Sequence, residues 1–212
     1  YFAANNTGVQ FIGCPKTIDG DLKHEDIEFS FGFDTATKTY SEIIGNIARD
    51  CNSAKKYWHF IKVMGRSASH VALECALETQ PNICLISEEV AAKKMSLSAI
   101  ADYIADSVEA RAAKGMNFGI AVIPEGVVEF VPEFSVLIHE INELLAGSKA
   151  DAFNALPTWE DKYAFIEKGL TKESMEVFAI LPTAIQQQLF LERAPHGNVQ
   201  VSLIESEKLF SA

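Results

Sequence analysis

The feature that most constrains the fold is an alternation, over residues 9–132, of short apolar runs with longer segments of helical periodicity. This pattern is typical of repeated strand-helix units around a parallel sheet. It predicts strands over residues 9–13, 57–64, 83–87 and 118–123. Apolar spacing predicts helices over residues 40–48, 68–79 and 96–114. The last of these is expected to have Ser96 or Ser98 as its N-cap and Gly115 in a left-handed conformation at its C-terminal end. The expected fold is therefore α/β, a three-layer Rossmann-like arrangement in which helices flank a parallel sheet.

The character of the sequence changes after Glu133, where β-branched runs disappear and helical segments dominate. One such segment covers residues 134–146, and another lies between Thr158, a suitable N-cap, and Gly169. We therefore expect a boundary near Pro132, with an α/β domain over residues 1–132 and a helical insertion over residues 133–212.

Composition narrows the possible partners and compartments. The formal net charge of −11 repels phosphate backbones at long range, so nucleic acid is not an expected partner. The four cysteines form no CxxC pair, and this spacing suits reduced thiols in the cytoplasm. No apolar run reaches the roughly 18 residues of a membrane helix, and the five histidines have no paired spacing that would predict a metal site.

The segment that follows the first predicted strand carries two carboxylates and a cation. Asp19 and Asp21 flank Gly20, whose conformational freedom lets the backbone turn both carboxylates into one cleft. One carboxylate can accept the proton of an attacking hydroxyl. Lys16 places a compact positive charge beside them, which suits phosphoryl oxygens. The combination indicates phosphoryl transfer, although carboxylates at this spacing also occur in ordinary solvated turns.

The complete run resembles the catalytic signature of phosphofructokinases, in the form found in members that use pyrophosphate: Pro15-Lys16-Thr17-Ile18-Asp19-Gly20-Asp21. The resemblance implies that Asp19 is the general base and that Asp21 supports catalysis. It places Thr17 and Ile18 against the substrate. Lys16 is the lysine associated with pyrophosphate, and ATP-using relatives typically carry a glycine at its position.

Two further strand ends match the same family. Met64-Gly65-Arg66 resembles its motif for fructose 6-phosphate, and Glu125, within Pro124-Glu125-Gly126, matches its glutamate that accepts hydrogen bonds from sugar hydroxyls. Lys56 and Tyr57 resemble a pair that reaches the sugar phosphate of the neighbouring subunit. Each short motif alone is also compatible with an ordinary turn, and their order along one chain gives them weight.

The resemblance implies a cytoplasmic enzyme, a homodimer or higher oligomer, that transfers a phosphoryl group from pyrophosphate to the 1-hydroxyl of fructose 6-phosphate. The family's GGxxPG, GGDD and YEGR-like motifs do not occur in this sequence. We therefore expect the main Mg²⁺ ligands outside this chain, no metal site within it, and no activity of the isolated chain.

Three alternatives stay open at this point: an ATP-dependent phosphofructokinase, a non-catalytic regulatory subunit of the same fold, and an unrelated α/β ligand-binding domain. Lys16 argues against the first. Retention of Lys16, Asp19 and Asp21 argues against the second.

Overall fold

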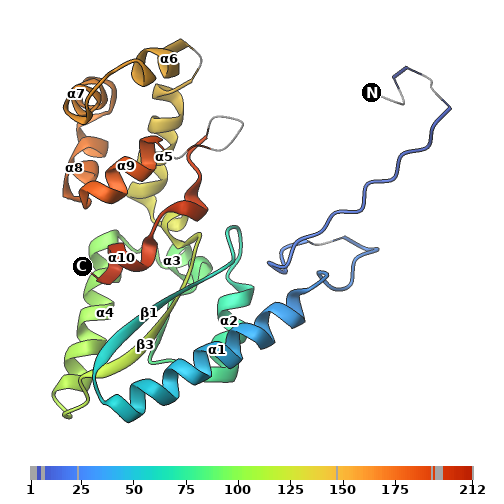
Figure 1. The fold of residues 1–212 in the computed structure, drawn as a ribbon, viewed down its shortest axis with the longest axis vertical. Coiled ribbons are helices and arrows are strands. Elements are labelled where there is room, and N and C mark those ends of the chain that lie inside the picture. The colour runs from blue at the N-terminus through green and yellow to red at the C-terminus, as the bar shows by residue number, and fades with distance from the viewer. Residues whose placement is uncertain are drawn as a thin grey trace.

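A computed structural model describes residues 4–5, 8–22, 24–146, 148–191, 193 and 198–211 (Figure 1). The α/β part consists, in chain order, of α1 (Phe33–Ala54), β1 (Tyr57–Val63), α2 (His70–Thr79), β2 (Ile83–Cys84), α3 (Ser87–Lys93), α4 (Leu97–Ala112) and β3 (Phe118–Pro124). The helical part that follows consists of the 3-10 helix η1 (Val127–Phe130), α5 (Pro132–Leu144), α6 (Ser148–Asn154), α7 (Trp159–Gly169), α8 (Lys172–Ile180), α9 (Thr183–Leu191), the 3-10 helix η2 (Val201–Leu203) and α10 (Ser206–Ser211).

The three strands form a parallel sheet in the order β1-β3-β2. The pairing of β1 with β3 runs from Tyr57 opposite Phe118 to Val63 opposite Pro124. Every residue of β3 after Phe118 is buried, as expected for a central parallel strand that is covered on both faces.

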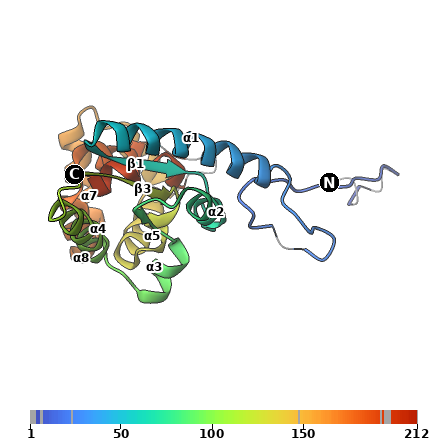
Figure 2. The same ribbon diagram turned by 90° about the horizontal axis from the view of Figure 1, so that it is seen from below.

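Alternate residues of β3 pack into two apolar clusters, one on each face of the sheet. Ile120 and Val122 pack with Ile44 of α1 and with Val71 of α2, whereas Ala121 and neighbouring alternate positions face the cluster that contains α4 and α5. Figure 2 shows α1 along one side of the sheet and α4 and α5 on the other. The predicted three-layer α/β fold is confirmed.

Several helix ends follow from local side-chain chemistry. The Oγ of Ser96, one of the two serines predicted as the N-cap, accepts a hydrogen bond from the Ala99 N–H at 3.1 Å and caps α4. Gly115, just after α4, has the predicted positive φ of +74°. The Oγ1 of Thr158 likewise accepts from the Asp161 N–H at 3.1 Å and caps α7.

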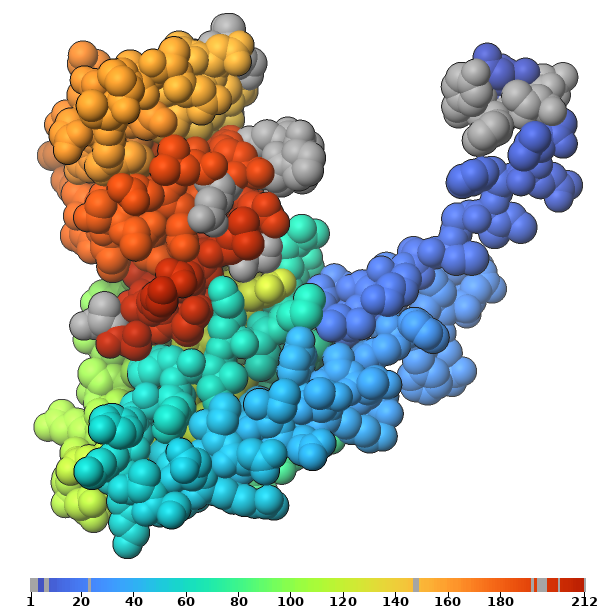
Figure 3. Space-filling model, viewed as in Figure 1, coloured from blue at the N-terminus to red at the C-terminus, as the bar shows by residue number. Residues whose placement is uncertain are grey.

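The strand predicted over residues 9–13 is wrong. These residues run as an extended, exposed segment without strand pairing, and the side chains of Phe11 and Ile12 are 77% and 83% exposed. Figure 3 shows this part of the chain as a narrow arm that projects from the folded body. An apolar run becomes a strand only when a neighbouring strand pairs with it, and residues 9–13 take no part in the described sheet.

The helical part packs directly on the α/β part. One apolar cluster runs from Ile83 and Ala121 in the sheet through Phe134 in α5 to Phe178 and Phe190 in the later helices. The boundary near Pro132 stays a prediction. In the described portion of the chain, no helix has the length and apolar character needed to span a bilayer.

Candidate active site

Two of the predicted motifs interlock at the carboxyl ends of β1 and β3. The Glu125 N–H donates to the Val63 carbonyl at 2.9 Å, and the Gly126 N–H donates to the Gly65 carbonyl at 3.2 Å. A Cβ at position 126 would overlap the backbone oxygen of Arg66. The structure therefore brings the 64–66 and 124–126 loops into direct backbone contact, and only a residue without a side chain fits at Gly126.

Gly65 is required by conformation as well as by space. Its φ is +132°, a value that residues with side chains rarely adopt, and a Cβ there would lie 2.6 Å from the Ala68 oxygen. The sharp turn exposes Arg66, while Met64 is 42% exposed. The loop after β1 thus exposes the side chains of residues 64 and 66 at the carboxyl end of the sheet.

The loop with the two aspartates lies against the first turns of two helices. A Cβ on Gly20 would come within 3.1 Å of the Phe33 ring in α1 and 3.2 Å of His70 Nδ1 in α2, and Ile18 lies beside Gly32. Within the loop, the Asp19 N–H donates to Thr17 Oγ1 at 3.2 Å.

The predicted residues of this loop differ in exposure. Thr17, Ile18, Asp19 and Asp21 are half-buried, whereas Lys16 is exposed. The two aspartates of the loop are therefore partly covered, whereas its lysine is exposed to solvent.

Electrostatics connects the aspartate loop to the strand-end loops. Burial raises the pKa of Glu125, and the nearby charge of Asp19 raises it further, while the Gly65 N–H, Lys62 and Arg66 act in the opposite direction. Burial also raises the pKa of Tyr40, and the nearby charge of Glu125 raises it further. The charge of Asp19 therefore lies near enough to Glu125 to raise the pKa of that carboxyl group.

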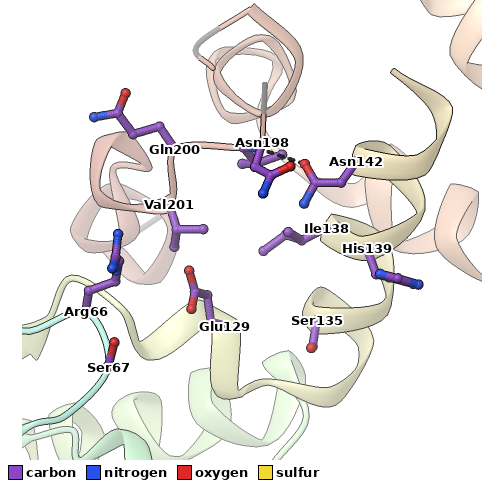
Figure 4. A pocket seen from close by; sticks show the side chains of 11 residues that line it. Arg66, Ser67, Glu129, Ser135, Ile138, His139, Asn142, Asn198, Gln200 and Val201 are labelled. Atoms are coloured by element: carbon purple, nitrogen blue, oxygen red, sulfur yellow. Dashed lines mark hydrogen bonds between the residues drawn. The ribbon is translucent and has the colours of Figure 1, made fainter. Parts of the chain in front are cut away.

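A polar cavity of about 510 Å³ is lined in part by Arg66 (Figure 4). Glu129 of η1 faces it, and the rest of its wall comes from the loop after β1, from α5 and from the segment that leads into η2: Ser67, Ser135, Ile138, His139, Asn142, Asn198, Val199, Gln200 and Val201. Burial raises the pKa of Glu129, and Arg66 partly offsets that effect. Arg66 therefore lies near enough to two half-buried glutamates, Glu125 and Glu129, to offset part of the rise in the pKa of each.

Lys56 and Tyr57 are not brought into this site. They lie at the start of β1, the edge opposite Met64, and both are exposed, Tyr57 at 71%. Lys55 and Tyr57 have positive φ values of 52° and 67°, which is unusual for residues with side chains. The strained turn holds the Lys56–Tyr57 pair outward.

The described residues contain no group of three or more His, Cys, Asp or Glu side chains arranged to hold a metal ion. Mg²⁺ needs near-octahedral oxygen ligation, of which a protein commonly supplies one or two carboxylates. The described residues therefore do not provide a set of Mg²⁺ ligands on their own. His196 lies outside the described residues.

Three residues that border the site were not predicted from the sequence: Tyr40, His70 and Glu129. Tyr40 carries an ordinary helical apolar signal, and Glu129 follows the third motif without a distinctive pattern. His70 lies four residues after Arg66, at the first position of α2. Only that short spacing from a recognised motif could have indicated it.

Comparison with known proteins agrees with the motifs. A family model described as Phosphofructokinase matches residues 2–172. A pyrophosphate--fructose 6-phosphate 1-phosphotransferase of Treponema pallidum is 57% identical over 209 residues, which make up 99% of this chain and 36% of that protein. The protein of the same name from Porphyromonas gingivalis is 56% identical over 211 residues, 100% of this chain and 38% of the relative.

A relative from Solanum tuberosum, named as subunit beta of the same phosphotransferase, is 52% identical over 208 residues, 98% of this chain and 35% of that protein. The chain thus spans little more than a third of the length of these curated relatives.

Proposed function

Because the chain belongs to the phosphofructokinase family, we propose that it carries the fructose 6-phosphate side of a pyrophosphate-dependent phosphotransferase. The whole enzyme transfers a phosphoryl group from pyrophosphate to the 1-hydroxyl of fructose 6-phosphate, and releases fructose 1,6-bisphosphate and phosphate. The observation that carries the proposal is the backbone contact that joins the loop of Arg66 to the loop of Glu125 at the carboxyl end of the sheet, where open α/β folds bind ligands.

In this proposal Asp19 is the general base. Its carboxylate takes the proton of the sugar 1-hydroxyl as the oxygen attacks the phosphoryl group. Asp21, two residues later in the same half-buried loop, supports the orientation and charge of Asp19. Lys16 faces outward from this loop, and its ammonium group meets the pyrophosphate oxygens and stabilises their charge in the transition state.

The remaining predicted residues bind the acceptor. Glu125 accepts hydrogen bonds from sugar hydroxyls, and Arg66 reaches phosphate or sugar oxygens, while Met64 and Gly65 shape the surface between them. Thr17 and Ile18 line the opposite side. The backbone contact between the 64–66 and 124–126 loops supports these roles, because it fixes the distance between Arg66 and Glu125 before a ligand arrives.

We further propose that the whole enzyme is a homodimer or higher oligomer in the cytoplasm. Lys56 and Tyr57 then contact the sugar phosphate bound to a neighbouring subunit. Their exposure at the far end of β1 supports this assignment, because within one chain they are separated from Arg66 by the length of the strand. Any Mg²⁺ that the enzyme uses is assigned mainly to ligands outside this chain.

The donor assignment is tested by Lys16→Gly in the full-length enzyme that contains this chain. Turnover with pyrophosphate should fall by roughly two powers of ten, on the order of 3 kcal/mol, because a cation that faces the transition state is lost. The matched control is Lys94→Gly, which removes the same charge at an exposed, left-handed position after α3. Equal turnover in the two variants would refute the role of Lys16.

The ATP-dependent alternative is not favoured, because Lys16 stands where ATP-using relatives typically carry glycine and because the relatives described above are named for pyrophosphate. The same kinetic experiment with ATP as donor separates the two. Turnover with ATP that exceeds turnover with pyrophosphate in the unaltered enzyme would reverse the assignment.

A further inference from the structure

The aspartate loop, residues 16–21, contains a conformationally free residue that the loop itself does not restrain. Gly20 lies between Asp19 and Asp21 with a φ of +75°, and glycine loses more conformational freedom on ordering than any other residue. The two carboxylates hold a productive arrangement only if the peptide planes next to Gly20 are fixed. The Asp19 N–H bond to Thr17 Oγ1 fixes the plane before Asp19, but it leaves the plane after Gly20 unrestrained.

His70 supplies the missing restraint. Its Nδ1 lies 2.8 Å from the carbonyl oxygen of Gly20, across 50 positions of the sequence. A carbonyl oxygen only accepts hydrogen bonds, so Nδ1 carries the proton and donates in this contact. Both the neutral Nδ1–H tautomer and the imidazolium ion satisfy that requirement, which makes the contact independent of the charge of the ring.

The backbone next to His70 is itself restrained by hydrogen bonds. His70 is half-buried at the first position of α2, directly after Ser69. The Ser69 N–H donates to Glu88 Oε1 at 3.0 Å, and the Ser69 Oγ accepts from the Ser87 N–H at 2.8 Å. These bonds join the start of α2 to the start of α3, so the backbone that carries the His70 ring is fixed in position.

We propose that His70 is a positioning residue for phosphoryl transfer, which holds the Gly20 carbonyl so that Asp19 and Asp21 stay aligned with the sugar hydroxyl. This inference rests on the function proposed above for the aspartate loop. His70 acts through the loop backbone. Its loss should therefore reduce kcat more than it changes the KM of either substrate, because misorientation of the base slows the chemical step while Arg66 and Glu125 still bind the sugar.

The test compares three substitutions in the full-length enzyme. His70→Leu removes the donor. His70→Asn keeps an amide N–H near the position of Nδ1, and His70→Gln places its amide farther out, near the position of Nε2. The Leu and Gln variants should lose about 5- to 10-fold in kcat, the scale of one hydrogen bond, with both KM values within about two-fold of the unaltered enzyme. The Asn variant should retain at least about half of kcat.

A second readout is independent of the reaction. Hydrogen exchange of the amides of residues 18–22 should become several-fold faster in the Leu and Gln variants, and should stay near the unaltered rate in the Asn variant. An enzyme without pyrophosphate-dependent activity would refute the proposed function, whereas this exchange pattern would still test the contact. Unchanged exchange in the Leu variant, or an Asn variant as slow in turnover as the Leu variant, would overturn the role of His70.

Discussion

Gly126 and Gly45 should respond in opposite ways to the same added methyl group. At Gly126 the backbone has an ordinary φ of −85°, so the requirement for glycine comes from space alone. A Cβ there would overlap the Arg66 carbonyl oxygen and lie 2.7 Å from its carbon. At Gly45, in the middle of α1, a Cβ would meet nothing within 4 Å.

The size of the effect at Gly126 follows from what must move. The obstacle is backbone, which has no rotamer to change, so the 64–66 and 124–126 loops must separate and lose the Gly126 N–H bond to the Gly65 carbonyl. Overpacking costs about 1–3 kcal/mol and the lost hydrogen bond about 1 kcal/mol. Gly126→Ala should therefore lower the free energy of unfolding by about 2–4 kcal/mol and the Tm by about 5–15 °C.

Gly45→Ala should instead raise the free energy of unfolding by about 0.5–1 kcal/mol, because alanine restricts the unfolded chain and favours helix. Thermal unfolding of both variants of the 212-residue chain, followed by circular dichroism, measures the contrast. In the full-length enzyme, Gly126→Ala should also raise the KM for fructose 6-phosphate, since Arg66 and Glu125 move apart. A Gly126→Ala variant with the unaltered Tm and KM would show that the two loops do not interlock.

Three further predictions concern the carboxylates and the chain as a whole. Asp19→Asn in the full-length enzyme should lower kcat by about 100-fold, the scale of general-base loss, while Asp26→Asn, at an exposed position, should leave kcat unchanged; equal rates in the two variants would place the base elsewhere. Glu125→Gln should raise the Tm of the isolated chain at neutral pH. Burial and the charge of Asp19 raise the pKa of Glu125 in the folded chain, so protonated Glu125 stabilises the fold fully below the pKa of the unfolded state. That stabilisation is lost as the pH rises through the pKa of the folded state, whereas glutamine stays neutral. The Tm difference should vanish below about pH 4, and a difference that persists in acid would contradict the assignment. The isolated 212-residue chain should bind fructose 6-phosphate weakly in calorimetry and show no turnover with pyrophosphate and Mg²⁺, because misplacement of reactants alone costs orders of magnitude; robust turnover would show that it holds a complete site.

The elements that were predicted correctly are those whose signals are local. Ser96 and Thr158 cap helices through hydrogen bonds that span three residues, so the sequence window contains both partners. The central strand β3 is apolar along most of its length and could be recognised without knowledge of its neighbours. The glycines of the Met64-Gly65-Arg66 and Pro124-Glu125-Gly126 motifs also identify positions where a side chain does not fit.

What could not be predicted depends on partners far away in the sequence. Residues 9–13 have the composition of a strand, but their state is decided by whether another strand pairs with them. His70 resembles any polar residue at a helix start until the fold brings Gly20 within hydrogen-bonding distance. The raised pKa of Glu129 arises because the chain after β3 turns inward and buries that carboxylate next to Arg66.

The burial of Glu129 connects the helical part of the chain to the site. Val127, Val128 and Val131 surround it in sequence and are completely buried, and they belong to the apolar cluster that extends to Phe134 and the later helices. The turn that carries Gly126 is therefore anchored by side chains that pack against the helical part. Since Gly126 fixes the distance between Arg66 and Glu125, packing within the helices beyond Pro132 contributes to the geometry of the proposed sugar site, although none of the predicted catalytic residues lies there.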